Sequence, residues 1–203
     1  MQFPLNVRNK RPLYVPAFAK ATFVCALAIV AGRALGQSSC EPSLVGSLSG
    51  FVTDVDVVDN TAYVAKQNGG LVIIDITDTE NPDVLGATVT PSSATHVSVT
   101  GNLAMVADED AGLQIVDVSE PTMPTIIGSL DVPGMAGPIA VVNGYVVLGQ
   151  SGNDEFGLHM IDVSDPTGPA LLSSVDMPGE VRGMAHADDL IYVAADLSGL
   201  QIV

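Results

Sequence analysis

The chain has 203 residues, of which 47% are hydrophobic and 15% charged, with 20 glycines and 13 prolines. This composition excludes a disordered or fibrous protein and indicates a turn-rich globular one. The formal net charge is −16, and so acidic a chain repels nucleic acid and anionic membranes, which excludes both as expected partners.

Residues 1–36 are predicted to be a secretory signal peptide. The apolar run at residues 21–32 is too short to span a bilayer and has the usual length of a signal-peptide core. Ala34 and Gly36 fit cleavage after Gly36, although Arg33 would fit an uncleaved anchor better. We therefore expect a bacterial or archaeal protein that is secreted, periplasmic or on the cell surface, with no membrane insertion after cleavage. The basic residues that precede the run are Arg8, Lys10, Arg11 and Lys20.

Residues 37–43 are predicted to be a short N-terminal segment of the mature chain. After cleavage the chain has 23 acidic residues and only two basic ones, Lys66 and Arg182, which gives a net charge of −21. Such a surface is expected to be solvated, and it would attract cations or a basic partner. Cys40 has no disulfide partner because Cys25 lies in the leader, and the three residues before Cys40 disfavour lipid attachment.

Two sequence elements recur from residue 44 onward with a period of about 42 residues. One is a Gly-Leu-aliphatic run beginning at Gly70, Gly112, Gly157 and Gly199. The other begins with proline, as in PSLVGSL from Pro42. Dividing the chain before this second element gives four repeats. They cover about residues 44–77, 84–119, 126–164 and 171–203, and the later copies of the proline element begin at Pro82, Pro124 and Pro169.

Two more apolar stretches lie between these elements in every copy, joined by a two-residue turn such as Asn143-Gly144. Asn-Gly and related pairs accept the positive φ angles of a tight hairpin. Each repeat therefore contains four short antiparallel strands, and almost no helix is expected. Four strands in about 42 residues, repeated in tandem, predict an all-β fold, a β-propeller with one blade per repeat; a solenoid of stacked sheets is the alternative.

The Pro-rich segments that end at Pro82, Pro124 and Pro169 are interpreted as the passages between blades, since proline cannot donate to a ladder. An aspartate recurs after each Gly-Leu strand, at Asp75, Asp117 and Asp162. A metal site is one interpretation. Capping of turn amides is the simpler one, because a repeated position serves something that every repeat shares.

The run GLQIVDVSEPTMPTIIGSLDVPG at residues 112–134, with the hairpins that follow, resembles the LVIVD-repeat family. The resemblance covers about Glu41 to Val203. It implies a secreted or surface propeller, often within a larger architecture, and implies no general catalytic activity or catalytic residues. The aspartate of the YVAD pattern is present at Asp108 but is Lys66 in the first copy and Gln150 in the third, so no role is expected to need it in every blade.

Candidate site residues are few. His96 and His186 fall in equivalent strands that could line the axial channel, and His159 lies in a Gly-Leu strand, but these scattered histidines do not form a zinc motif. The oxygen-rich loops around Asp108 and Asp110 and around Asp154 and Glu155 are weak calcium candidates, because they lack the spacing of a calcium-binding loop. No other cofactor is expected.

The sequence therefore predicts a non-enzymatic interaction module, with a protein or surface component as its unidentified partner. Two alternatives remain. One is a hydrolase or lyase in the channel that uses Asp54, His96 or His186; the other is a structural part of a larger surface protein. Since the last Gly-Leu strand stops at Val203, a truncated member of a longer propeller is expected rather than a four-bladed ring. Its exposed sheet edges would then favour self-association.

Overall fold

The protein is described by a computed structural model that covers residues 47, 50–152 and 155–203. The predicted signal peptide and residues 37–43, with Cys40, lie outside the described residues. Within the described part, helix is confined to two short 3₁₀ turns, η1 (Gln67–Gly69) and η2 (Asp196–Ser198). None of the helices described is long and apolar enough to cross a membrane.

The described residues form fifteen strands, which pair in chain order as three sheets of four strands and one of three. Neighbouring strands are antiparallel, so each sheet is a meander. The strands are β1 (Asp54–Val58), β2 (Thr61–Lys66), β3 (Gly70–Asp75) and β4 (Asp83–Thr88) in sheet 1; β5 (His96–Thr100), β6 (Leu103–Ala107), β7 (Leu113–Asp117) and β8 (Thr125–Leu130) in sheet 2; β9 (Met135–Val142), β10 (Tyr145–Ser151), β11 (Gly157–Asp162) and β12 (Ala170–Asp176) in sheet 3; and β13 (Gly183–Ala187), β14 (Leu190–Ala194) and β15 (Leu200–Ile202) in sheet 4.

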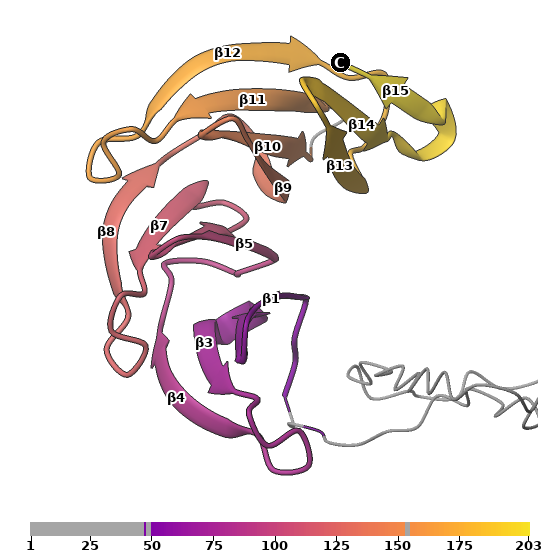
Figure 1. Cartoon of the computed structure of the whole chain (residues 1–203). Helices are drawn as coiled ribbons and strands as arrows, with labels where there is room; N and C mark the ends of the chain where they lie inside the picture. The colour runs from indigo at the N-terminus through magenta and orange to yellow at the C-terminus, as the bar shows by residue number, and fades with distance from the viewer. Residues whose placement is uncertain (1–46, 48–49, 153–154) are drawn as a thin grey trace, which may run out of the picture.

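The four sheets are arranged around a common axis, as Figure 1 shows. Strands β1, β5, β9 and β13 lie on the inside, and β4, β8 and β12 form the outer rim. This is the arrangement of a β-propeller in which each sheet is one blade, and it confirms the predicted fold.

The hairpins between the two inner strands of each sheet have the predicted turns. Asp59, Gly101, Asn143 and Asp188 each begin such a turn, with φ angles of 52°, 56°, 51° and 52°. Positive φ is tolerated by glycine, asparagine and aspartate better than by other residues, which explains why these types recur there. The short turns fix the register of each inner pair.

The strand order corrects the predicted division into repeats. The element expected to begin each repeat is instead the outermost strand of the preceding sheet, because β4 pairs with β3 and β8 pairs with β7. The Pro-rich segments are therefore turns within a sheet rather than passages between blades. A tandem of hairpins can be divided after any strand, and the prolines suggested the wrong place. The passages between sheets are residues 89–95, 131–134 and 177–182, and the repeats of about 44–77, 84–119, 126–164 and 171–203 are replaced by sheets at 54–88, 96–130, 135–176 and 183–202.

A hydrophobic cluster fills the space between each pair of consecutive sheets. Leu71 and Ile73 of sheet 1 pack with Val106 and Val116 of sheet 2, and all four are fully buried. Similar clusters lie between sheets 2 and 3 and between sheets 3 and 4. Full burial of such a side chain contributes about 1.5–3 kcal/mol, so the contacts between blades stabilise the fold strongly.

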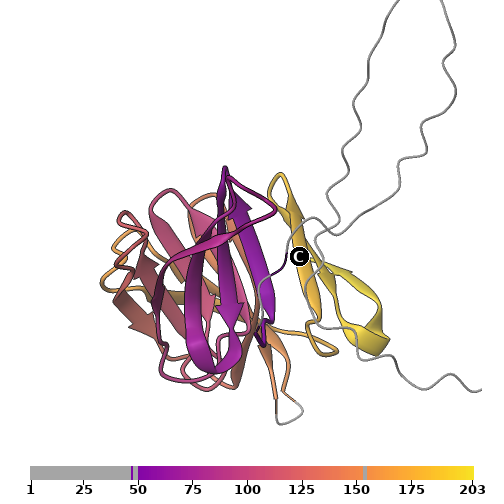
Figure 2. The same cartoon turned by 90° about the horizontal axis from the view of Figure 1, so that it is seen from below.

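Sheets 4 and 1 are not packed together in this way. Strand β1 contacts β5, β5 contacts β9 and β9 contacts β13, whereas β13 makes no comparable contact with β1. Figure 2 shows sheet 4 standing beside sheet 1 rather than stacked on it. The face of sheet 1 that is turned away from sheet 2 carries a small apolar cluster around Ala62, Val64 and Ile74. Leu200 and Ile202 of sheet 4 are 65% and 58% exposed.

Candidate functional site at the ends of the inner strands

A pocket of about 180 Å³ lies where β5 and β9 begin and where the chain enters β13. Sheets 2 and 3 and the passage into sheet 4 line it, at the inner ends of the sheets. Its volume suits one side chain better than a drug-sized ligand, since pockets for such ligands are about 300–1,000 Å³. The polar residues that line it are Thr95, His96, Glu109, Ser151, Glu180 and Arg182.

His96, the first residue of β5, was expected to approach the axial channel, and it lines this pocket. Its Nδ1 atom is buried and has no hydrogen-bond partner among the described residues. Burial lowers the pKa of the imidazole, while the carboxylate of Asp54 acts in the opposite direction. A neutral ring with an unpaired nitrogen is therefore favoured at the pocket wall.

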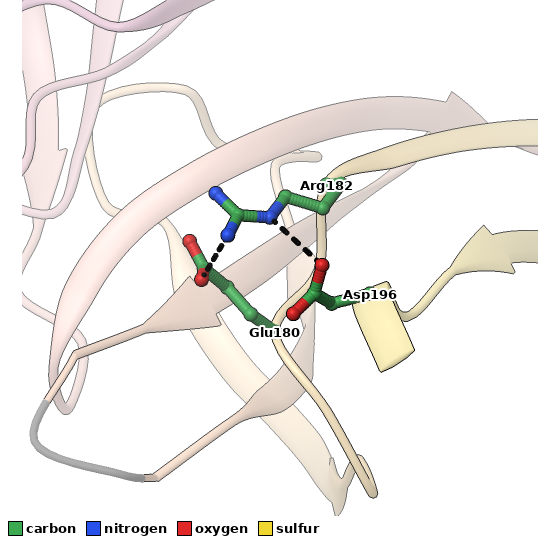
Figure 3. Close-up of polar contacts among 3 residues, drawn as sticks. All are labelled: Glu180, Arg182 and Asp196. Carbon is green, nitrogen blue, oxygen red and sulfur yellow. Dashed lines mark ion pairs between the residues drawn. The ribbon is translucent and has the colours of Figure 1, made fainter. Parts of the chain in front are cut away.

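Arg182 carries the positive charge of the pocket, and Figure 3 shows its two acidic neighbours. Its Nη2 atom lies 2.8 Å from Glu180 Oε2, and its Nε atom lies 3.7 Å from Asp196 Oδ1. The arginine side chain is 58% exposed, so each pair contributes at most about 1 kcal/mol. In the described part of the chain, ion pairs are found on Arg182 alone, which leaves Glu109 on the pocket wall without a cation.

Polar side chains that the sequence analysis did not single out join the inner strands of neighbouring sheets. Thr53 Oγ1 donates to the carbonyl oxygen of Ala94 at 2.8 Å. Forty-two residues later, Thr95 Oγ1 lies 3.3 Å from the carbonyl oxygen of Ala136. Two threonines at this offset, each just before an inner strand, are the signal that could have identified them.

Asp54 and Asp56 of β1 act in the same way on the free edge of β5. Asp54 Oδ2 accepts from the amide of Val97 at 3.0 Å, and Asp56 Oδ2 accepts from the amide of Val99 at 2.7 Å. The other oxygen of Asp54 accepts from Val55 N at 2.9 Å. Both oxygens of this predicted catalytic candidate are therefore bound to backbone amides, which indicates a structural role.

The histidines do not gather into one site. The residue of β13 equivalent to His96 is Gly183, and His186 lies three positions further along the strand, so its side chain belongs to the opposite face of the sheet. His186 is exposed. His159 is buried in β11, where its Nδ1 lies 2.7 Å from Ser174 Oγ, and burial lowers its pKa. Of the residues proposed for a channel hydrolase or lyase, Asp54 and His96 are neighbours, whereas His186 is separated from them.

The calcium candidates do not form a metal site among the described residues. Asp108 is fully buried, and its oxygens accept from Thr90 Oγ1 at 2.6 Å and from Ser92 N at 2.8 Å. This carboxylate therefore fastens the passage between sheets 1 and 2 rather than pointing into a solvent-exposed loop. Asp110 is two residues further along the same loop and is exposed, and Asp154 lies outside the described residues. Within the described ranges, Glu155 included, histidine, cysteine, aspartate and glutamate side chains form no group of three or more that could hold a metal ion.

The recurring aspartates at the ends of the Gly-Leu strands have the geometry expected of turn caps. The Oδ1 atoms of Asp75, Asp117 and Asp162 accept from the backbone amide two residues later, at 2.7, 2.9 and 2.8 Å. The hydrogen bonds from Thr77, Ser119 and Ser164, respectively, lower the pKa of these carboxyls.

The glycines at the start of the Gly-Leu runs are required by the backbone geometry there. Gly70 and Gly112 have φ angles of 68° and 69°, and an added methyl group would collide with the carbonyl oxygens of Thr88 and Leu130. Glycine is needed there both for the positive φ and for the close approach of the outer strand. Gly157 is also crowded, since a methyl group would lie 3.1 Å from the carbonyl oxygen of Val175.

The family model for the LVIVD repeat matches the chain three times, at residues 49–90, 91–132 and 133–177. The chain belongs to the LVIVD-repeat family. The matched segments follow the sheets, each running from before an inner strand to the end of an outer one. No curated protein matches this LVIVD-repeat chain.

Solved structures that resemble this LVIVD-repeat protein support the fold alone, because each is 15% identical in sequence. The computationally designed Ika4 protein has a TM-score of 0.62 over 78% of this chain and 94% of its own. The designed Ika8 protein has a TM-score of 0.60 over 74% of this chain and 45% of its own. The WD40 β-propeller domain of Doa1 has a TM-score of 0.61 over 74% of this chain and 50% of its own.

Proposed function

We propose that this LVIVD-repeat propeller is a non-enzymatic interaction module that is secreted, periplasmic or displayed on the cell surface, and that it binds a basic partner at the pocket at the ends of the inner strands. The main support is Glu109, a carboxylate on the pocket wall with no ion-pair partner among the described residues. A lysine or arginine side chain of a partner would provide the missing charge.

The volume of the pocket and the charge of the whole molecule fit this function. A volume of about 180 Å³ admits one long side chain. The excess of 23 acidic residues over two basic ones after the leader would draw a basic partner toward the surface. The pocket would then select the side chain.

Titration calorimetry with a lysine-rich peptide tests the proposal. Glu109→Gln combined with Glu180→Gln removes two charges from the pocket, and we expect it to weaken binding at least about tenfold, or about 1.4 kcal/mol. The matched control is Glu80→Gln with Glu120→Gln, which removes two charges from exposed turns outside the pocket and is expected to change affinity less than about twofold. Equal losses in both variants would mean that the acidic surface attracts the peptide without a site at the pocket.

Export is tested separately. The full chain, expressed in a bacterial host, is expected to appear outside the cytoplasm with its N-terminus at Gln37, as measured by mass spectrometry. An intact leader recovered in the membrane fraction would contradict cleavage and support an anchored form.

A further inference from the structure

The turn between β9 and β10 consists of Asn143 and Gly144, and both residues are exposed. Their φ angles are 51° and 83°. Apart from the chain neighbours of Gly144, no described atom lies within 4 Å of the position that a methyl group on this glycine would take. Nothing in the described structure therefore crowds the peptide bond that joins the two residues.

An asparagine followed by glycine can lose its side-chain amide without an enzyme. The backbone nitrogen of Gly144 gives up its proton and attacks Cγ of Asn143, the Cγ–Nδ2 bond breaks, and ammonia leaves with that proton. Water then opens the succinimide ring, which yields aspartate or, when the other ring bond breaks, isoaspartate. Both products have a carboxylate in place of the neutral amide. A side chain on the second residue hinders the attack, and glycine has none.

The side chain of Asn143 also joins sheet 3 to sheet 4. Its Nδ2 donates to Oδ1 of Asp189, in the turn between β13 and β14, at 2.9 Å. Val142, which precedes this asparagine, and Ile191 of β14 are both buried in the hydrophobic cluster between the two sheets. The hydrogen bond therefore lies at the turn end of the interface that this cluster fills.

We propose that Asn143 is a site of spontaneous deamidation and that its product loosens sheet 4 from sheet 3. A carboxylate at position 143 cannot donate to Asp189, and the two like charges repel each other at this short distance. Asp188, the other residue of the β13–β14 turn, adds to the local negative charge. Because the ammonia is lost, the fraction of loosened molecules grows with the age of the protein.

The turn itself accepts the product. Asp59 and Asp188 hold the position equivalent to Asn143 in sheets 1 and 4, and each has a φ angle of 52°. Aspartate at position 143 therefore keeps the turn conformation, and its effect on the interface comes from the contact with Asp189. The variant Asn143→Asp consequently represents the aspartate product in a chain that folds.

Peptide mass spectrometry of the purified full chain, aged in mildly alkaline buffer, tests the site. Asn60 and Asn102 are internal controls, because they are exposed in the equivalent turns but are followed by Thr61 and Leu103. Asn143 is expected to exchange NH₂ for OH at least about tenfold faster than either control, a difference of about 1.4 kcal/mol in activation free energy. Equal rates at the three positions, or no product at Asn143, would overturn the proposal.

Amide hydrogen exchange tests the effect on sheet 4. In Asn143→Asp, the amides of β13 and β14 are expected to exchange about fivefold faster than in the parent chain. The control Asn102→Asp adds the same charge to the turn of sheet 2 and is expected to leave these amides unchanged. Unchanged exchange in Asn143→Asp, or an equal effect of the control, would overturn the loosening of sheet 4.

A double variant identifies the contact responsible. Asn143→Asp with Asp189→Asn places the amide and the carboxylate on the opposite turns, so the hydrogen bond can form in the reverse direction. We expect this variant to exchange at the rate of the parent chain. Exchange as fast as in Asn143→Asp alone would show that the carboxylate does not act through residue 189 and would overturn the proposed cause. None of these measurements involves a ligand, so they are independent of the proposed function.

Discussion

At the scale of single residues, one group of carboxylates binds partners across the boundary between sheets, and another lies in solvent on exposed turns. Asp54 and Asp56 bind amides across the boundary between sheets 1 and 2. Asp108 binds the passage between the same sheets, whereas the side chains of Glu80 and Glu120 are on exposed turns. The bound group holds blades together, so substitutions in it are expected to affect stability far more than substitutions in the solvent group.

Asp108→Asn tests this division at its most buried member. In asparagine an NH₂ group replaces one carboxylate oxygen, and this group cannot accept a hydrogen bond. One of the two bonds, from Thr90 Oγ1 or from Ser92 N, is therefore lost in either orientation of the amide. We expect a loss of about 1–3 kcal/mol in the free energy of unfolding, measured with urea, and the same loss with or without EDTA. Glu120→Gln is the control, with a change of less than about 0.5 kcal/mol. A loss for Asp108→Asn that disappears in EDTA would instead indicate a calcium ligand.

The outer-strand glycines permit a second test at this scale. Gly86→Ala and Gly128→Ala each force a methyl group against the carbonyl of a proline in the next sheet, and overpacking of this kind costs about 1–3 kcal/mol. Position 173 of β12 is the equivalent position, occupied by an exposed serine. Ser173→Ala is therefore expected to be nearly neutral. Equal urea midpoints for all three variants would show that the turns do not press on the outer strands.

At the scale of elements, the sequence predicted the strands better than their grouping. The hairpin turns were predictable because Asp59, Gly101, Asn143 and Asp188 are local signals for positive φ. The division into sheets was not, because it depends on which edge each strand pairs with, and Pro-rich turns resemble linkers. The pocket was predicted only at His96, since Glu109 lies in the β6–β7 loop, Arg182 lies in the passage before β13, and the two share no local pattern.

The turn after each third strand predicts a response to acid. The pKa values of Asp75, Asp117 and Asp162 are lowered in the fold by the hydrogen bonds that these aspartates accept. The unfolded chain, with aspartate pKa values of about 3.9, therefore takes up protons first as the pH falls. The stability from these turns is complete above the unfolded pKa and is lost as the pH falls through the folded values.

Urea unfolding between about pH 2 and 6 measures this loss. Replacing all three aspartates by asparagine keeps an acceptor oxygen in each turn but removes the titrating group. The variant is therefore expected to fold at neutral pH and to lose less stability in acid than the parent chain. If the free energy of unfolding falls equally steeply with pH in the two proteins, the three turn aspartates are not the source of the loss in acid.

At the scale of the whole molecule, the net charge opposes the compact state. After the leader, 23 acidic residues face two basic ones, and the ion pairs of the described part both involve Arg182. Repulsion among these carboxylates favours expanded states. Salt shortens the screening length from about 30 Å at 0.01 M to about 10 Å at 0.1 M, so the compact state should gain stability as salt is added.

The melting temperature is therefore expected to rise by a few degrees as sodium chloride is added and then to level off. Each kcal/mol of added stability corresponds to a rise of about 2–4 °C. Magnesium and calcium chloride at equal ionic strength separate screening from a bound ion. Screening by the acidic surface predicts the same shift for both salts, whereas a calcium site adds a further rise that grows with the calcium concentration. Since the oxygens of Asp108 are already occupied by Thr90 and Ser92, we expect equal shifts. A calcium-specific rise that Glu155→Gln removes would place an ion at the loop before β11.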